Sequence, residues 1–223
     1  MTGITPVAEF AVPPTEPSDL LLPAEVRAFR TGRWVRMVPV EHSHIDFLYS
    51  LVCDEWTGPR WRYLGAVPPR EQFQTEMSQG LLAQFVVVER ATGQPVGHVQ
   101  AYNPDINAGV ASLAAAMAPA AHRTGIGIEA GYLFAQYLFQ TFRLRKLYIE
   151  VPSFNLPLLR GAIAAVGRLE GVLKGHVYYD GRFWDRHVVA IYREDLADKS
   201  MRDVLRQRDL TRPDRRPTDG PAA

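Results

Sequence analysis

The sequence predicts a mixed α+β domain whose central sheet is twisted, mostly antiparallel and flanked by helices. Three observations favour this fold class. With 47% hydrophobic residues, a chain of 223 residues can bury a sizeable core. The middle of the chain has the pattern of a three-stranded meander, at residues 81–90, 95–105 and 109–117. A loop with two glycines then runs directly into an amphipathic helix.

The two ends of the chain are expected to lie outside this domain, which then spans 31–197. Residues 1–30 contain five prolines, which interrupt regular structure, so we expect an extended arm with a short helix near 24–29. The arm is expected to pack on the domain or on a second subunit, which leaves a homodimer open. Residues 198–223 are rich in Arg and Asp without an apolar period, which predicts a flexible charged tail.

The segments around the meander supply the remaining elements. Before it, alternation predicts a strand at 33–40, and helical spacing predicts helices at 41–53 and 70–80. After the glycine loop come a strand at 146–152 and a helix at 155–166, which the side chain of Asn155 is expected to cap. The chain ends the domain with two strands joined through Asp180-Gly181, a strong hairpin signal.

Residues 56–69 form a predicted loop that is dense in aromatic and basic side chains. Its candidate substrate-binding residues are Trp56, Trp61, Arg62 and Tyr63. Two interpretations are open, because the loop could pack its indoles onto the core, as Trp usually does, or form a lid over a substrate. Indole and guanidinium groups suit a compact substrate with an apolar body and a carboxylate or phosphate.

The glycine loop predicts a ligand that contains phosphate. Gly125 and Gly127 allow backbone conformations closed to other residues and let a ligand approach the main chain. The helix that follows directs its unpaired N–H groups and the positive end of its dipole at this point. His122, Arg123 and Thr124 stand just before the helix, where they can add charge and hydrogen bonds.

Composition argues against several other classes of partner. A net charge of +1, from 25 basic and 24 acidic residues, gives no overall attraction to nucleic acid or to an anionic membrane. Cys53 is the only cysteine, and no His or Cys spacing is typical of zinc sites, so we expect neither a disulfide nor a metal. No export signal and no apolar run of about 18 residues occurs, which favours a cytoplasmic protein.

A dinucleotide-binding fold is the sharpest alternative for the glycine loop. Gly125-x-Gly127-x-x-Ala130 matches the dinucleotide fingerprint, and Glu150 follows at about the expected distance. In that fold, however, the strand leads directly into the first glycine, whereas 118–124 intervene here. The elements before the loop are also predicted to be antiparallel hairpins, so we set this alternative aside.

The predicted order of elements over 33–195 resembles the GNAT superfamily of acyl-CoA-dependent N-acyltransferases. The stretch from His122 to Gly127 is similar to its central motif, although His122 stands where the family has Gln or Arg. The proline two residues after Met117 supports the resemblance. The C-terminal hairpin is similar to the subgroup that contains the ribosomal-protein N-terminal acetyltransferases. The resemblance implies acetyl-CoA, or another acyl-CoA, as co-substrate, bound by Met117, His122, Arg123, Thr124, Gly125, Ile126, Gly127, Ile128 and Asn155.

Acyl transfer from a thioester requires an uncharged amine, stabilisation of an oxyanion and a proton for the leaving thiolate. Many members of the family use a glutamate on the strand before the glycine loop and a tyrosine seven residues after the Asn. Here that strand carries no carboxylate, and the second position is Ala162. Our candidates are therefore Glu150 first, with Asn155 and His98. Glu150 could instead pair with Lys146 or Arg145, and His98 could be a satisfied sheet histidine.

Three functions stay open at this point. The first is transfer of an acyl group from acetyl-CoA to the primary amine of a small molecule. The second is the same chemistry on the N-terminus of a protein or peptide. The third is a non-catalytic domain that binds an acyl-CoA, which the missing carboxylate favours.

Overall fold

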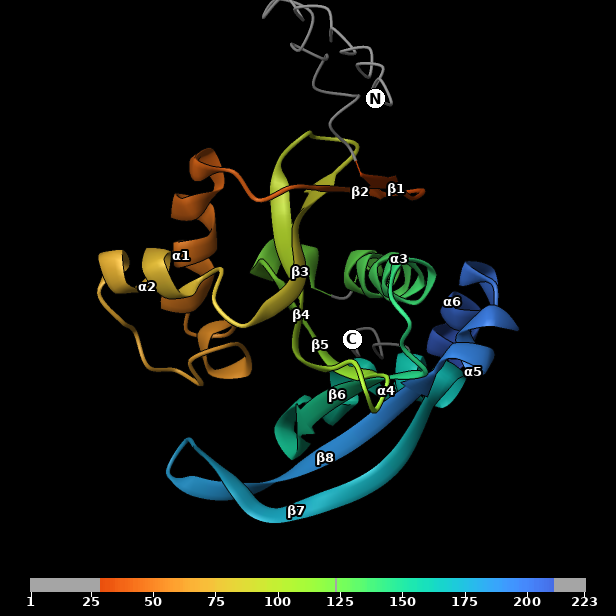
Figure 1. Cartoon of the computed structure of the whole chain (residues 1–223). Helices are drawn as coiled ribbons and strands as arrows, with labels where there is room; N and C mark the ends of the chain where they lie inside the picture. The colour runs from red at the N-terminus through yellow and green to blue at the C-terminus, as the bar shows by residue number, and fades with distance from the viewer. Residues whose placement is uncertain (1–28, 123, 211–223) are drawn as a thin grey trace, which may run out of the picture.

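The computed structural model describes residues 29–122 and 124–210, which build a single sheet with helices on both faces (Figure 1). The strands are β1 (Arg30–Thr31), β2 (Val35–Val38), β3 (Leu81–Glu89), β4 (Pro95–Asp105), β5 (Val110–Met117), β6 (Lys146–Pro152), β7 (Gly167–Tyr179) and β8 (Arg182–Tyr192). The helices are α1 (Ile45–Cys53), α2 (Arg70–Glu76), α3 (Ile126–Thr141), α4 (Leu156–Val166), α5 (Arg193–Ala197) and α6 (Met201–Leu210).

The strand order is β1-β2-β3-β4-β5-β6-β8-β7, and all neighbours are antiparallel except β5 and β6. Helices α1 and α2 cover one face of the sheet, and α3 covers the other (Figure 1). Helices α4 and α5 also contact the sheet, and α6 packs against α4 and α3. On the α3 face, Phe134 and Leu138 are fully buried against strand residues such as Val99. On the α1 face, Leu48 and Phe73 are fully buried in a second cluster. Helices α1, α2 and α3 therefore each bury apolar side chains in a core beside the sheet.

The sheet divides between β5 and β6. These two strands pair only from Val110↔Lys146 to Ser112↔Tyr148. Beyond this point β5 stays in register with β4 up to Met117, and β6 stays in register with β8 up to Pro152. The two halves of the sheet therefore separate toward the carboxyl ends of β5 and β6, beside the N-termini of α3 and α4.

A buried carboxylate attaches the β1–β2 turn to α3. The side chain of Glu129 is 2% exposed, and its oxygens accept hydrogen bonds from the backbone N–H groups of Arg33, Trp34 and Val35 at 2.6, 2.8 and 3.1 Å. These three donors satisfy a charge that would otherwise be costly to bury.

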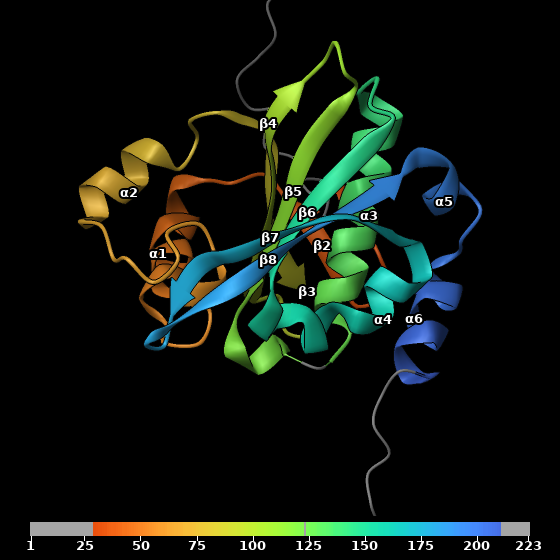
Figure 2. The same cartoon turned by 90° about the horizontal axis from the view of Figure 1, so that it is seen from below.

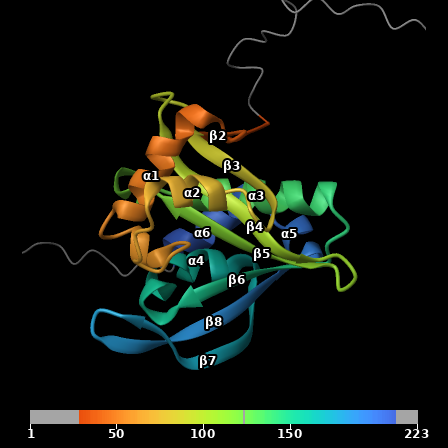
Figure 3. The ribbon, with the colours of Figure 1, turned by 60° about the vertical axis from the view of Figure 1, so that its left-hand side comes forward.

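The structure confirms the α+β fold class and the mostly antiparallel sheet. The meander, the strand at 146–152 and the closing hairpin form as predicted, with Asp180 at φ 51° and Gly181 at φ 74° in the turn. Figure 3 shows this long β7–β8 hairpin at the edge of the molecule. No helix in the described part of the chain is long and apolar enough to cross a membrane.

The C-terminal segment differs from the prediction. Helix α6 forms inside the predicted flexible tail, and Val204 is 2% exposed where α6 packs against α4 and α3 (Figure 2). Ser200 and Asp203 bond each other's backbone N–H groups and so cap the helix. The helix is short and mostly polar, and a cap and one buried side chain hold it in place. Such a helix has no apolar period, so the sequence pattern did not predict it. The predicted helix at 24–29 and the end of the tail lie outside the described residues, apart from Phe29.

Candidate functional site

A cavity of about 190 Å³ lies where β5 and β6 separate, and we call it the cleft. On the α3 face its walls are the small residues Gly127 and Gly131 of α3 and Ala162 of α4. On the α1 face it reaches Arg60, Tyr102 and Glu150. Strand alternation explains the second set, because Tyr102 is paired with Ser112 and Ser112 with Tyr148, which puts Tyr102 and Glu150 on the α1 face. The cleft thus connects both faces of the sheet.

Three glycines shape the α3 wall in different ways. Gly125 is the N-cap of α3 at φ 98°, a left-handed conformation that other residues rarely adopt. At Gly127, a Cβ atom would lie only 3.0 Å from Met117 Cγ. At Gly131, a Cβ atom would meet nothing within 4 Å, because the position opens into the cleft. A glycine inside a helix costs about 1 kcal/mol relative to alanine, so this one is consistent with a ligand that approaches the helix closely.

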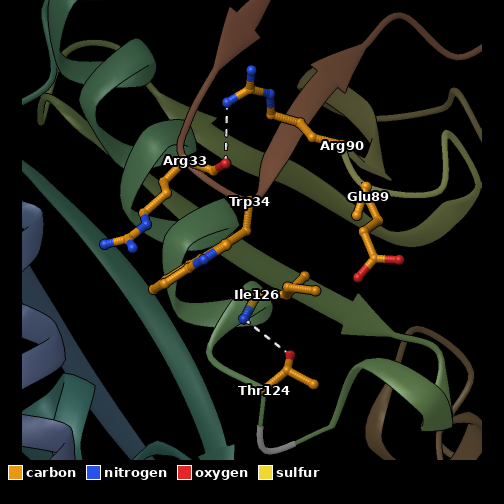
Figure 4. A pocket seen from close by; sticks show the side chains of 7 residues that line it. Arg33, Trp34, Glu89, Arg90, Thr124 and Ile126 are labelled. Carbon is orange, nitrogen blue, oxygen red and sulfur yellow. Dashed lines mark hydrogen bonds between the residues drawn. The ribbon is translucent and has the colours of Figure 1, made fainter.

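The side chains of the glycine loop turn away from the cleft. The ring Nε2 of His122 lies 3.0 Å from the carbonyl oxygen of Met117. The Thr124 hydroxyl donates to Ala121 O at 2.7 Å and accepts from Ile126 N at 3.2 Å. Figure 4 shows Thr124 and Ile126 beside Trp34 in a second hollow of about 250 Å³ on the other flank of α3. Arg123 lies outside the described residues.

The main chain near Met117 is already partly engaged. Its carbonyl oxygen accepts a hydrogen bond from Thr57 Oγ1 at 3.1 Å as well as facing the His122 ring. Among the described residues, β5 has no strand partner on its β6 side beyond Ser112, and Ala114 and Ala115 line the cleft there. The open edge available to an extended ligand therefore begins earlier on β5 than Met117.

Glu150 lines the cleft and is ion-paired. Its Oε2 accepts a hydrogen bond from Arg186 at 2.8 Å, and the side chain stays 34% exposed. The partner differs from those considered from the sequence, because Lys146 binds Glu170 at 2.7 Å and Arg145 bonds the carbonyl of Ala108.

Tyr102 stands on the same face of the cleft as Glu150. Burial and then the charge of Glu150 raise the pKa of the Tyr102 phenol above its usual range. This residue was missing from our sequence-based candidates. No local pattern distinguished it, because only the pairing of β4 with β5, and of β5 with β6, brings it to Glu150.

His98 does not line the cleft. The side chain is fully buried, its Nε2 is 3.1 Å from Gln84 Oε1, and its ring is 5.4 Å from that of Trp61. Burial, and secondarily the charge of Arg62, lowers the pKa of His98 to about 3. The ring is therefore neutral at physiological pH and enclosed by the core. No group of three or more metal-ligating side chains occurs in the described part of the chain.

The loop at 56–69 divides between the two roles considered for it. Trp61 is 4% exposed and belongs to the core under α1. Arg62 donates to the carbonyls of Glu76 and Met77, and the Tyr63 hydroxyl donates to the Glu76 carboxylate. None of these three lines the cleft, and neither does Trp56, which is 43% exposed. The physical reason is that the turn at Gly58–Arg60 directs Trp61 back to the core.

Arg60 is the loop residue that reaches the cleft. Its guanidinium lies 3.7 Å from the ring centroid of Trp56, 5.3 Å from that of Phe154 and 5.8 Å from that of Tyr179. Trp56 belongs to the loop after α1, whereas Phe154 lies in the short helical turn that follows β6, and Tyr179 is the last residue of β7. Arg60 therefore bridges the two halves above the cleft, and we call this set the Arg60 bridge.

Asn155 lines the cleft, and its side chain does not cap α4 as we predicted. It is the N-cap residue of α4 but makes no side-chain cap hydrogen bond. Its Oδ1 is buried and has no hydrogen-bond partner among the described residues, although it lines the cleft. A buried acceptor of this kind is available to a ligand N–H group.

Comparison with known proteins places the chain. The family described as "Acetyltransferase (GNAT) domain" matches residues 35–162, more than half of the chain. Among solved structures, a GCN5-related N-acetyltransferase from Brucella melitensis is 24% identical, with a TM-score of 0.62, over 84% of this chain and 86% of that one.

Two further structures share the fold at lower identity. A spermidine/spermine N-acetyltransferase from Vibrio cholerae is 16% identical over 75% of this chain and 97% of its own, with a TM-score of 0.62. The ribosomal L7/L12 alpha-N-protein acetyltransferase RimL, in complex with coenzyme A, is 14% identical over 74% and 97%, with a TM-score of 0.64. No curated protein sequence matches. From the matched domain, this chain belongs to the GNAT family of N-acetyltransferases.

Proposed function

We propose that this protein transfers an acyl group directly from an acyl-CoA, with acetyl-CoA the first donor to test, to the primary amine of a small molecule. The observation that carries the proposal is the cleft itself, which joins a wall of glycine and alanine on α3 and α4 to Glu150 and Tyr102 on the opposite face. Such a passage lets two substrates meet inside the sheet from opposite sides, which is the arrangement that direct transfer needs.

The α3 wall suits the donor. The N-terminus of α3 favours the pyrophosphate, Gly127 and Gly131 leave room beside the helix, and Asn155 Oδ1 can accept a hydrogen bond from an amide of the pantetheine arm. The thioester supplies the activated acyl group. We propose that the backbone N–H groups of residues 123–128 bind the pyrophosphate. The side chains of His122 and Thr124 instead shape the loop.

Glu150 and Tyr102 supply the proton chemistry in this proposal. The amine nitrogen forms a bond to the acyl carbon as the carbon–sulfur bond breaks. Glu150 accepts the amine proton, directly or through a water, and the Tyr102 hydroxyl provides a proton to the leaving sulfur. Arg186 holds the Glu150 carboxylate in position through their 2.8 Å contact. His98 is left out of this set because it is enclosed by the core.

The acceptor side favours a compact amine that carries a negative group. The Arg60 bridge crosses the opening, so an extended chain has less room there than a small molecule. Arg60 lines the cleft, and Arg186 is ion-paired with Glu150, which is the carboxylate among the residues that line the cleft. A polycation would therefore meet two guanidinium groups and one carboxylate that is already paired.

A screen of primary amines with acetyl-CoA, in which the released coenzyme A thiol is measured, tests the proposal. We expect turnover with amines that also carry a carboxylate or phosphate, and less with polyamines. Turnover with polyamines alone would overturn the assignment of the acceptor. A protein that binds acetyl-CoA yet stays silent with every amine would support the non-catalytic alternative.

One observation favours a protein N-terminus as the second candidate acceptor. At the tip of the β7–β8 hairpin, Tyr178 and Phe183 are 61% and 68% exposed, with ring centroids 5.1 Å apart. Exposed aromatic pairs are common at surfaces that bind other proteins. Peptides added to the same screen separate the two candidates. A cytoplasmic location belongs to the proposal as well.

A further inference from the structure

The cleft has a closed end that is entirely apolar. Where β5 and β6 meet, its lining residues come from six different strands and helices and are at most 9% exposed: Leu113, Ala135, Val166, Ile191, Leu196 and Val204. Protein interiors are normally close-packed, and open apolar space costs stability. Such space tends to stay dry and to admit apolar groups.

The closed end lies in line with the path of the donor. Gly127, Gly131 and Ala135 follow one another at four-residue intervals along one flank of α3. They lead from the N-terminus of the helix, where the pyrophosphate is proposed to bind, to the closed end, a rise of about 12 Å. On α4, Leu159, Ala162 and Val166 make the facing wall. A thioester at the level of Glu150 would direct its acyl chain to the closed end.

The C-terminal segment completes this end of the cleft. Leu196 of α5 and Val204 of α6 both follow the part of the chain that matches the family, which ends at residue 162. The hydroxyl of Tyr132 on α3 donates to the carbonyl of Lys199 at 2.7 Å, which fixes the connection between α5 and α6. Two of the six residues that line the closed end therefore come from a segment that lies beyond the matched family domain.

We propose that the closed end is an acyl pocket that selects donors with chains longer than acetyl, and that Val204 and Leu196 set the length it accepts. The ligand class is a short-chain to medium-chain fatty acyl-CoA. This inference rests on the proposed function, because it assumes that an acyl-CoA occupies the cleft. Each methylene buried in the pocket should strengthen donor binding about fourfold.

Calorimetric titration of the full chain with coenzyme A, acetyl-CoA, butyryl-CoA and hexanoyl-CoA, in the absence of any amine, tests the pocket. We expect butyryl-CoA to bind more than tenfold more tightly than acetyl-CoA. Val204→Phe should remove this preference, whereas Leu158→Phe, the same kind of enlargement on the exposed side of α4, should keep it. If Val204→Phe fails to fold, Ala135→Val carries the same test from α3.

The outcomes separate the two proposals. Equal affinity for acetyl-CoA and butyryl-CoA, or a preference that survives both cavity-filling variants, would overturn the acyl pocket and leave the proposed function standing. Failure of coenzyme A and of every thioester to bind would overturn both.

Discussion

The two faces of the cleft are built in different ways. The α3 face is a wall of backbone and small residues on two helices, with Gly127, Gly131 and Ala162 as its main members. The α1 face consists of long side chains, Arg60, Tyr102 and Glu150, from three separate segments. A wall of backbone and small residues can bind the coenzyme A part that all acyl-CoA donors share. Long side chains, by contrast, discriminate between ligands by their charge and shape. If the proposed donor and acceptor sites are correct, substitutions on the two faces should change donor binding and acceptor choice separately.

The largest expected effect would come from removing the proposed base on the α1 face. Glu150→Gln keeps the shape and removes the basicity, so kcat should fall roughly 100-fold while donor binding is retained. The remaining rate should keep rising with pH, as more of the amine deprotonates in solution. Steady-state kinetics from pH 6 to 9 check this result.

Glu170→Gln is the matched control, because Glu170 pairs with Lys146 and does not line the cleft. Its kcat should match that of the parent. A Glu150→Gln variant within about threefold of the parent would make the Glu150–Arg186 pair structural, and the two faces would then differ less than we propose.

The second prediction concerns the pH dependence of the free energy of unfolding, which buried His98 on the α1 face should affect. The pKa of buried His98 is lowered to about 3, whereas in the unfolded chain it is near 6.5. Above pH 6.5 both states hold a neutral ring. As the pH falls toward 3, only the unfolded state gains the proton, so stability should drop by about 2 kcal/mol between pH 7 and pH 5.

Urea unfolding at the two pH values measures this loss. His98→Leu should reduce the loss, and His176→Leu, at an exposed position, should not. An unchanged dependence in His98→Leu would mean that the loss comes from other groups.

On the α3 face, Gly127→Val should weaken acetyl-CoA binding at least tenfold. A Cβ at this position already approaches Met117 Cγ to 3.0 Å, and the larger side chain would project toward the donor. Calorimetry measures the affinity, and circular dichroism checks the fold. Gly171→Val is the control, since a Cβ there meets nothing within 4 Å and the position lies on β7. If the affinity of Gly127→Val for acetyl-CoA were unchanged, the donor would not bind against α3.

The smallest effect is expected at the Arg60 bridge. Arg60→Ala should raise the KM of the amine several-fold and leave donor affinity unchanged, because Arg60 borders the acceptor side. Trp61→Ala, one residue further, should instead lower the melting temperature without changing either constant, since Trp61 is buried in the core. Equal losses for amine and donor in Arg60→Ala would show that the bridge holds the whole cleft.

The α3 face was largely predictable because its determinants are local. Gly125, Gly127 and the helix that follows lie within a few residues of one another, so the sequence alone predicts the glycine loop and the start of α3, where we propose that the pyrophosphate binds. The α1 face depends on the register between strands that are far apart in the sequence. This register brings Tyr102 to the same face as Glu150, and no local sequence pattern reveals it. Turn geometry had a similar effect in the aromatic loop, where Arg60 rather than Trp61 reaches the cleft.

The attachment of the β1–β2 turn to α3 has a consequence for local unfolding. The amides of Arg33, Trp34 and Val35 are bonded to Glu129, which lies 94 to 96 residues further along the chain. In native-state hydrogen exchange these amides should open together with α3 and not with the adjacent edge strand, because they belong to the same cooperative unit. A shortened chain that starts after Val35 would strip a buried carboxylate of its donors, in the helix that forms one wall of the cleft.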